Sequence, residues 1–363
     1  MNLVCTELLS YNFRNLVQKK FDFRGKRIGF VGENGHGKTN ILEAMYLALQ
    51  GSSWRTTSDA ELIAFGEREA FSEIVLDWSG VNSNLKCELI ETYGKVKKRF
   101  VVNGVARTRR FLAAQAAVLL FAPDDLAVVS GTPGIRRNYL DRYLSNVDFE
   151  YTQNLSNYQK IVQSRNRLLE NIREGNAQLL DLEYWTERMI YFGARVVKAR
   201  MDFLLQIAPD GEYGVRYKPN LELGDLCVMI EEICEIYNER VKRNLQKEII
   251  SAMSQYGPHK DDYEFMLKKN SIEAFGSRGQ QRSVLLWFIR EQVNYMLHVR
   301  KVRPILLLDD MFSELDSYHR DTMLGMFEEM QIFISGCEEH YFERKSLIFD
   351  QIWRIEGGRA ELV

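Results

Sequence analysis

Residues 32–39 read Gly32-Glu33-Asn34-Gly35-His36-Gly37-Lys38-Thr39, and this stretch decides the fold. It is a complete GxxxxGK[ST] P-loop and follows the short apolar run Arg27–Val31, which predicts a strand. The next stretch, Ile41–Gln50, carries helix formers with apolar spacing and predicts a helix. A strand, a glycine-rich turn and a helix in this order predict an α/β protein that binds phosphate.

The chemistry of the P-loop follows from its residue types. Glycines allow positive φ, so the backbone N–H groups can wrap a β-phosphate, and the following helix directs its positive end at the same anion. Lys38 would reach the β- and γ-phosphates and act in catalysis, while the Thr39 hydroxyl would bind Mg²⁺. We expect the nucleotide on Gly32, Asn34, Gly35, Gly37, Lys38, Thr39 and Asn40.

A second element supports the P-loop. Ile305–Leu308 is an apolar run that ends in two carboxylates, Asp309 and Asp310, which is the Walker B pattern. Asp309 is the expected Mg²⁺ ligand, and Asp310 is the expected catalytic group that orients or activates the attacking water. Lys38 and Asp309 stand 271 positions apart, so a large insertion must divide the nucleotide-binding core.

Composition sets the broad class. The chain has 363 residues, of which 45% are hydrophobic and 27% charged, and its net charge is −2. At about 150 residues per domain this length predicts two globular domains. A protein with this charge must bind any nucleic acid through a local surface or one created by assembly.

Five scattered cysteines without a CxxC pair favour neither a disulfide framework nor a zinc site, and they suit a reducing interior. The start MNLVCTELLSYNFR lacks the pattern of a signal peptide, and the apolar runs are too short for a membrane span. We therefore expect a soluble, cytoplasmic protein without a membrane partner.

The rest of the chain divides into three stretches. Strand patterns at Phe71–Trp78, Leu85–Tyr93 and Lys98–Val102, the last closed by the hairpin turn Asn103–Gly104, continue the first α/β part. After residue 256 the chain returns to α/β, with a helix at Ser283–Val299 and strands at 305–308 and 331–335.

The middle of the chain is helical. Apolar seams run from Tyr151 to Ile172, where Arg165 interrupts the pattern, from Leu182 to Phe203, and from Leu226 to Leu245. Residues 209–225 are rich in Gly and Pro and predict a loop, with room for a short strand. Three seams of this length fit either a compact bundle or a protruding arm.

With these motifs in order, the sequence resembles the RecF family of bacterial recombination-mediator ATPases, whose heads are of the ABC type found in SMC proteins. The matching segments are Tyr11–Asn15 (YNFRN), Gly32–Asn40 (GENGHGKTN), Phe121–Leu126 with Gly131 and Arg136–Asp141, Gly257–Asp262 (GPHKDD), Ser277–Arg282 (SRGQQR), and Leu307–Asp316 (LLDDMFSELD).

The resemblance implies the architecture. We expect an ABC-type, SMC-like P-loop ATPase head of two lobes, built from residues 1–125 and 256–363. One lobe would carry the P-loop, and the other would carry the signature SRGQQR and Walker B. Residues 126–255 would form an inserted, mainly helical arm domain.

The resemblance also implies the function. ATP sandwiched between two subunits would drive a homodimer on DNA, near gaps and single-strand/double-strand junctions. Hydrolysis would release the dimer, and RecR with RecO would help to load recombinase in replication, recombination, repair and the SOS response. Asp310 stands where faster relatives usually carry Glu, so we expect a slow, DNA-stimulated ATPase that acts as a switch.

Some residue roles are carried over by the resemblance. Ser277, Gly279 and Gln280 would contact the γ-phosphate of ATP on the opposite subunit, and Asp316 would lie across the dimer interface. Arg14 would touch a phosphate or the adenine, unless it is an ordinary surface arginine of a strand.

Other roles stay open. His259 and Asp262 would either stabilise a turn or contact the nucleotide or the dimer interface. Five arginines would either contact DNA phosphates or lie on a solvated face: Arg107, Arg109, Arg110, Arg136 and Arg137. The chain departs from the family at Arg278, where Gln is usual. It also lacks a clear switch residue in Gly336–His340, so the γ-phosphate sensor has no assigned residue.

Two other functions compete with this reading. A transporter-type ABC ATPase subunit would work on a membrane partner, which the NFRN start, GPHKDD, SELD and the helical insert disfavour. An OLD-type ATPase would carry a further carboxylate-rich nuclease domain, and only about fifty residues follow Asp316.

Overall fold

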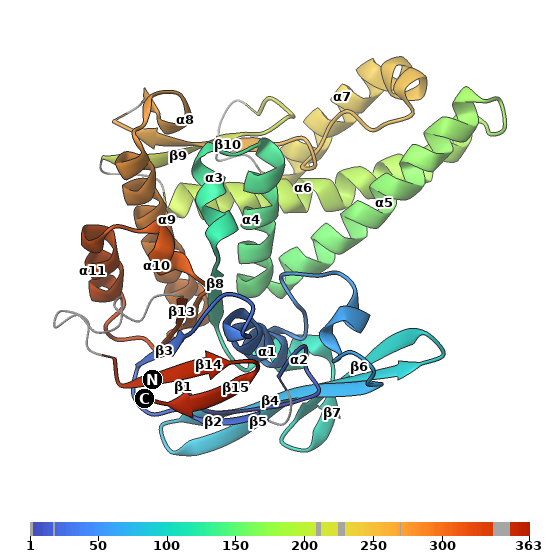
Figure 1. The fold of residues 1–363 in the computed structure, drawn as a ribbon. Helices are drawn as coiled ribbons and strands as arrows, with labels where there is room; N and C mark the ends of the chain where they lie inside the picture. The colour runs from blue at the N-terminus through green and yellow to red at the C-terminus, as the bar shows by residue number, and fades with distance from the viewer. Residues whose placement is uncertain (1–2, 17–18, 208–211, 224–228, 269, 337–348) are drawn as a thin grey trace. The chain divides into compact units, whose positions relative to one another are not determined.

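The computed structural model describes residues 3–16, 19–207, 212–223, 229–268, 270–336 and 349–363. The chain forms two compact units, shown in Figure 1. The first unit contains residues 1–125 and 292–363, so it is built from both ends of the chain. The second unit contains residues 126–291. Each unit is described by itself below.

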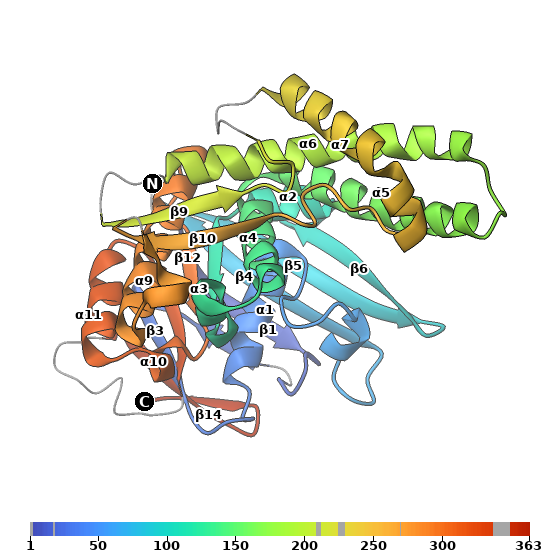
Figure 2. The same cartoon turned by 90° about the horizontal axis from the view of Figure 1, so that it is seen from above.

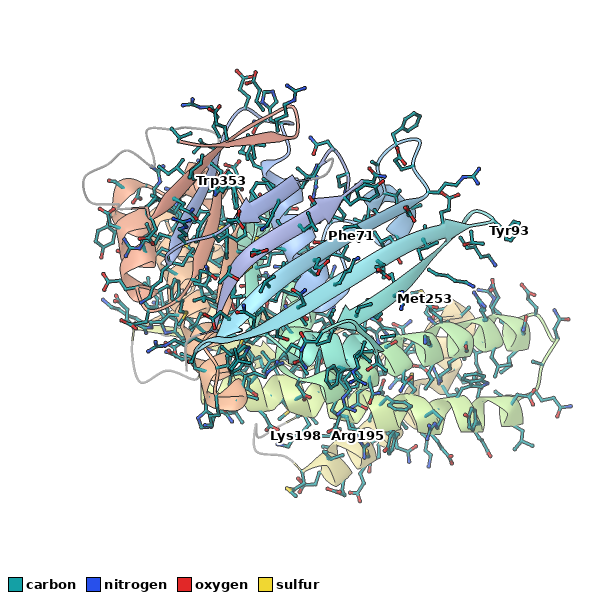
Figure 3. The ribbon with its side chains drawn as sticks, turned by 90° about the horizontal axis from the view of Figure 1, so that it is seen from below. Phe71, Tyr93, Arg195, Lys198, Met253 and Trp353 are labelled. Atoms are coloured by element: carbon teal, nitrogen blue, oxygen red, sulfur yellow. The ribbon has the colours of Figure 1, made fainter. Side chains whose placement is uncertain are left out.

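One sheet of the first unit is antiparallel and has the order β2-β1-β4-β5-β6-β7. Asn103 and Gly104, with φ of 50° and 77°, form the tight turn between β6 and β7, as the sequence predicted. Figure 3 shows Phe71 on β4 and Tyr93 at the end of the β5–β6 hairpin. The strands are β1 (Leu3–Tyr11), β2 (Lys19–Asp22), β4 (Glu69–Trp78), β5 (Val81–Thr92), β6 (Lys95–Val102) and β7 (Val105–Arg107).

The other sheet of the first unit has the order β15-β14-β3-β13-β12-β8. All neighbours from β14 to β8 are parallel, whereas β15 pairs antiparallel with β14. Only β13 separates β3, which leads into the P-loop, from β12, which carries Walker B. The strands are β3 (Arg27–Val31), β8 (Val118–Phe121), β12 (Ile305–Leu308), β13 (Ile332–Gly336), β14 (Gln351–Glu356) and β15 (Arg359–Leu362).

Helix α1 (Lys38–Gln50) supplies the centre of the core of the first unit. Its Ile41, Leu42 and Met45 are fully buried in one apolar cluster that also takes side chains from both sheets. An amphipathic helix buried this completely needs apolar neighbours on nearly every side, and two sheets provide them. The shorter helices are η1 (Asp59–Leu62), α2 (Arg109–Ala114), η2 (Pro123–Leu126), α10 (Met311–Glu314) and α11 (Ser317–Met326).

The second unit is mainly helical. Helices α5 (Phe149–Arg173), α6 (Leu182–Gln206) and α7 (Ile230–Ser251) pack on one another, and Figure 2 shows α5 and α6 as a helical hairpin. The sheet β11-β10-β9 joins β9 (Tyr213–Lys218), β10 (Asp262–Leu267) and β11 (Asn270–Ser271). The other elements are α3 (Ala127–Ser130), α4 (Pro133–Val147), η3 (Leu179–Asp181), α8 (Ile272–Phe275) and the first part of α9 (Arg278–Arg300).

The predicted elements agree with these bounds to within a few residues, and β9 is the short strand for which the 209–225 loop left room. Leu226, the start of the third seam, lies outside the described residues. Residues 256–291, expected in the ATPase head, are grouped with the second compact unit, in which β10 pairs with β9 and β11. The expected domain bounds stay a prediction.

The expectations about membrane spans, disulfides and zinc can be compared with the structure for the described residues. Among the described residues, no helix combines the length and apolar character needed to cross a bilayer. Cys5, Cys87 and Cys234 are free thiols, whereas Cys227 and Cys337 lie outside the described residues. No cluster of three or more His, Cys, Asp or Glu within the described ranges is arranged to hold a metal ion.

Candidate nucleotide-binding site

The P-loop has the backbone that a phosphate cradle requires. Gly32, Gly35 and Gly37 have φ of 143°, 84° and 113°, a region that L side chains rarely adopt. A Cβ at Gly32 would lie 2.3 Å from the Ile355 carbonyl oxygen, whereas a Cβ at Gly35 would meet nothing within 4 Å. Glycine is therefore required at position 32 by both contact and φ, and at position 35 by φ alone.

Lys38 begins α1 directly after this loop. Its side chain is buried, and Nζ donates to the carbonyl oxygens of Gly32 at 2.6 Å and Glu33 at 2.8 Å. The ammonium group thus lies across the mouth of the loop. A buried cation that donates to two loop carbonyls retains an attraction for an anion, which suits a phosphate-binding lysine.

The Walker A threonine and the Walker B carboxylate are in direct contact. Thr39 Oγ1 donates to Asp309 Oδ1 at 2.8 Å, and Ser335 Oγ donates to the same oxygen at 2.7 Å. Thr39 follows β3, Asp309 follows β12, and Ser335 belongs to β13, which lies between these two strands. The carboxyl ends of three neighbouring parallel strands therefore converge here, as at ligand sites of open α/β sheets.

Asp310 is held in an unusual backbone conformation. Its φ is 46°, its N–H donates to Ser335 Oγ at 3.0 Å, and its carbonyl accepts from Ser313 Oγ at 2.7 Å. A non-glycine residue in this region costs free energy, and such residues cluster at functional sites. Burial and the neighbouring Asp309 carboxylate raise the pKa of Asp310, which favours a group that can exchange a proton.

Arg14 is not an ordinary surface arginine. Its Nε and Nη2 donate to both carboxylate oxygens of Glu43, at 3.0 and 2.9 Å, and the Glu43 side chain is fully buried on α1. Arg55 Nη1 donates to Glu43 at 3.1 Å and to Asn40 Oδ1 at 2.7 Å. The network links the predicted ligands Arg14 and Asn40 through a carboxylate.

A cavity of about 570 Å³ opens beside this network. Arg14, Asn15 and Asn40 form part of its wall. Other lining residues come from the loop after η1, including Ile63, Ala64, Phe65 and Gly66. The cavity combines polar groups with an apolar wall, as sites for planar ligands do.

The predicted interface residue Asp316 lies in the first unit as the N-cap of α11. Its Oδ1 accepts the His319 N–H at 3.0 Å, and both carboxylate oxygens lie 2.8 Å from His319 Nδ1. An N-cap aspartate stabilises the start of a helix by satisfying a free N–H. This local role does not test the predicted position across a dimer interface.

The signature residues lie in the second unit and cap α9. Ser277 N–H donates to Gln280 Oε1 at 2.8 Å, and Gln280 N–H lies 3.3 Å from Ser277 Oγ, which is a reciprocal capping box. Ser277, Arg278, Gly279 and Gln280 are all exposed. The start of α9 therefore presents a hydroxyl and backbone N–H groups at the surface of its unit.

The GPHKDD segment is structural in the second unit. Asp262 accepts from Arg136 at 2.7 and 2.8 Å. His259 Nδ1 lies 2.6 Å from the Tyr158 hydroxyl oxygen, and its Nε2 lies 3.0 Å from Ser254 O. Burial lowers the pKa of His259 to about 4. Two roles were left open for His259 and Asp262. In the structure both residues make contacts that stabilise the turn.

The arginines proposed to face DNA or solvent have different surroundings. Arg136 is only 3% exposed, so it does not lie on a solvated face. Arg137 Nη1 donates to Asp261 O at 2.7 Å, and Arg136 donates to Asp262, so both arginines hold the GPHKDD segment. Arg109 donates to Gln50 O and Ser52 Oγ, both at 2.8 Å, while Arg107 lies over the Phe111 ring. Arg107, Arg109 and Arg110 are exposed.

Several members of the site were absent from the sequence prediction. Ser335, Glu43 and Arg55 each bond to a predicted residue, yet none belongs to a motif. Glu43 could have been found from the sequence, because a carboxylate among the apolar residues of Ile41–Leu47 predicts a buried carboxylate with a cationic partner. The expected sensor region after Gly336 lies outside the described residues at positions 337–340.

A larger cavity of about 910 Å³ lies in the second unit, between α6 and α7, and contains no motif residue. Leu182, Ile190, Val241 and Leu245 supply apolar walls, and Glu183, Glu187 and Glu235 supply acidic ones. Size alone therefore does not mark the nucleotide site, which is defined by its residues.

Comparison with known proteins agrees with this geometry. A family model described as an AAA domain matches residues 11–190. The DNA replication and repair protein RecF of Ruminiclostridium cellulolyticum is 30% identical over 98% of this chain and 98% of its own.

Two groups of solved structures share the fold. The structure of the recombination mediator protein RecF-ATPrS in the RecFOR pathway matches with a TM-score of 0.89 and 24% identity, over 100% of this chain and 98% of that one. The SmcHead bound to the C-winged helix domain of ScpA matches with a TM-score of 0.53 and 15% identity, over 99% and 96%. The fold is therefore that of an ABC-type, SMC-like P-loop ATPase head, and the chain belongs to the RecF family of DNA replication and repair proteins.

Proposed function

We propose that this protein is an ATP-dependent, DNA-binding recombination mediator that acts in gap repair. One observation carries the ATPase part of the proposal, the 2.8 Å hydrogen bond between Thr39 Oγ1 and Asp309 Oδ1. It joins the Walker A hydroxyl to the Walker B carboxylate. The family supplies the DNA repair part.

The residues at this point fit Mg²⁺ and a nucleoside triphosphate. A hydroxyl and a carboxylate are hard oxygen donors of the kind Mg²⁺ prefers, and Mg²⁺ bound there would offset charge on the β- and γ-phosphates. Lys38 would turn from the loop carbonyls to the phosphates, and the P-loop N–H groups would hold them. Asp310 would accept a hydrogen bond from the attacking water and orient it.

The other ligands complete the proposal. Arg14 would touch a phosphate or the adenine from the wall of the 570 Å³ cavity, while keeping its pair with Glu43. Ser277, Gly279 and Gln280 would meet the γ-phosphate bound by a second subunit, with Asp316 across that interface. The exposure of Ser277 at the start of α9 supports this role, because the N-terminus of a helix directs its positive end at an external anion.

In this scheme ATP drives a homodimer on double-stranded DNA near gaps and junctions. Slow hydrolysis then releases the dimer, after time for RecR, with RecO, to arrive and assist recombinase loading. The reason for slow turnover is the short side chain of Asp310, since misplacing a catalytic group by about 1 Å can cost a hundredfold in rate.

Dimerisation is the experiment that tests the proposal. We expect a monomer without nucleotide and a dimer with ATP and Mg²⁺ by analytical ultracentrifugation, with ATPase activity stimulated by gapped DNA rather than by lipid vesicles. Ser277→Arg should bind ATP normally and remain monomeric, because a bulky cation would fill the contact with the γ-phosphate.

Asn294→Arg is the matched control, since it adds the same charge at an exposed position of the same helix. It should dimerise like the unaltered protein. Normal ATP-dependent dimerisation of Ser277→Arg would remove the proposed role of the signature. Stimulation by vesicles alone would instead favour the transporter reading.

A further inference from the structure

The C-terminal hairpin β14–β15 touches the P-loop at both of its ends. In-register pairing of β14 with β3 places Arg354 opposite Val31, so Ile355 comes next to Gly32. A Cβ on Gly32 would lie 2.3 Å from Ile355 O. At the other end of the P-loop, the Gly358 N–H donates to His36 O at 2.9 Å. Figure 1 shows the hairpin, and Figure 3 labels Trp353 on β14.

Asn15 fills the space between this hairpin and the start of α1. Its carbonyl oxygen would lie 2.2 Å from a Cβ on Gly358, and its side-chain oxygen 2.8 Å from a Cβ on Gly37. The same side-chain oxygen accepts from Asn40 Nδ2 at 2.8 Å. Asn15 therefore contacts the hairpin with its backbone and the phosphate-binding segment with its side chain.

These contacts exceed what a hairpin at the edge of a sheet requires. Pairing of β14 with β3 and β15 satisfies the strands, and none of the contacts at Gly358 belongs to that ladder. They fall instead on the half of the P-loop that carries Gly37 and Lys38. Ordering a loop residue costs conformational entropy, so external contacts that fix the loop favour binding.

We infer that Gly358 and Asn15 are positioning residues of the nucleotide site, which hold residues 36–38 of the P-loop in the conformation that binds the β-phosphate. This inference rests on the proposed function. Neither residue touches the phosphates, and both act through the loop. Because the β-phosphate is common to ATP and ADP, loss of the contacts should weaken both nucleotides equally.

The turn of the hairpin offers a matched pair of variants. Gly357 and Gly358 are consecutive, with φ of 51° and 74°, so Ala at either position suffers a similar backbone strain. A Cβ at Gly357 meets nothing within 4 Å, whereas a Cβ at Gly358 overlaps Asn15 O. The difference between Gly357→Ala and Gly358→Ala therefore reports the contact with Asn15 and the P-loop.

The measurement is the dissociation constant for ATP and for ADP by calorimetry, with thermal unfolding recorded in the absence of nucleotide. We expect Gly358→Ala to bind both nucleotides about three- to tenfold more weakly than Gly357→Ala, which is the range for one lost hydrogen bond. Equal dissociation constants for the two variants would overturn the inference, as would a loss confined to ATP.

Asn15→Ala keeps the backbone carbonyl and removes the bond to Asn40, and Asn15 is exposed, so this variant decides the matter if Gly358→Ala does not fold. It should weaken both nucleotides without lowering the melting temperature. Unchanged binding would overturn the inference. Failure of the unaltered protein to bind ATP would instead overturn the proposed function, and this inference with it.

Discussion

The two compact units bury charge for different purposes. In the first unit, Lys38, Glu43 and Asp309 are buried charged residues of the P-loop helix and the strand end beside it. In the second unit, Arg165 and Glu248 form a fully buried pair at 2.7 Å, and Arg200 pairs with Asp141 at 2.7 Å and with Asp261 at 3.3 Å.

The difference teaches how to interpret a motif. The buried Lys38 and Asp309 lie at the P-loop, where Lys38 donates to two loop carbonyls and Asp309 accepts from Thr39 and Ser335. The GPHKDD motif puts Asp261 and Asp262 against arginines of α6 and α4, and His259 against a tyrosine of α5. We propose that the first motif binds a ligand, whereas the contacts of the second stabilise its own unit.

Breaking the Arg165–Glu248 pair should give the largest effect. Arg165→Met leaves a buried carboxylate without its cation, so the free energy of unfolding should fall by about 3–5 kcal/mol in denaturant titrations. Arg165→Met with Glu248→Leu should recover most of this loss.

The exposed pair Arg243–Glu239 on α7 is the control, and Arg243→Ala should change stability by less than about 1 kcal/mol. A cost for Arg165→Met as small as for this control would show that the second unit does not depend on its buried charge.

Acid should weaken the second unit through His259. Its pKa is about 4 in the folded protein, against an ordinary value of 6.5, because burial disfavours the charged ring. Above pH 6.5 the ring is neutral in both states. Between pH 6.5 and about pH 4 the unfolded chain binds a proton that the folded chain excludes. The free energy of unfolding therefore decreases as the pH is lowered through this range, by up to about 3 kcal/mol.

His259→Gln is neutral at every pH and should flatten this part of the stability curve. Comparison of the two proteins also separates the effect of Asp261, whose pKa burial raises and which therefore acts in the opposite direction. Parallel curves for the two proteins would contradict the assignment to His259.

Asp310→Asn should separate chemistry from binding in the first unit. The carboxylate that orients water is lost, while Thr39, Asp309 and Lys38 remain, so hydrolysis should fall about a hundredfold or more with ATP affinity unchanged. Dissociation from DNA in the presence of ATP should be slower than for the unaltered protein. Release at the unaltered rate would mean that hydrolysis does not time it.

Lys38→Met should give the smallest of these effects on free energy. Loss of a charge-assisted contact worth roughly 1.5–3 kcal/mol lowers ATP affinity about ten- to a hundredfold by calorimetry. Because the variant is apolar and of similar length, stability without nucleotide should change by less than about 1.5 kcal/mol. Arg165→Met is expected to lower stability, whereas Lys38→Met is expected to lower ATP affinity with little change in stability. A large loss of stability in Lys38→Met would contradict this difference between the two units.

Much of the fold could be predicted from short stretches of sequence. Arg27–Val31 and Ile305–Leu308 are strands with those bounds, and Asn103–Gly104 is a turn, because alternation, apolar runs and turn residues act locally. The grouping of residues 256–291 with the second unit follows from pairing of β10 with β9, a strand for which the sequence offered only room within a stretch rich in Gly and Pro.

The sequence by itself determined the P-loop, the Walker B strand and the helical insert, since each is specified by residues within a few turns of one another. Only the tertiary structure decided that Ser335 shares Asp309 with Thr39, that Glu43 holds Arg14, and that Gly358 meets the P-loop. The physical reason is that a buried polar group must find a partner, and folding brings that partner from outside the local segment, 26 residues away for Ser335 and 270 for Thr39 in the case of Asp309.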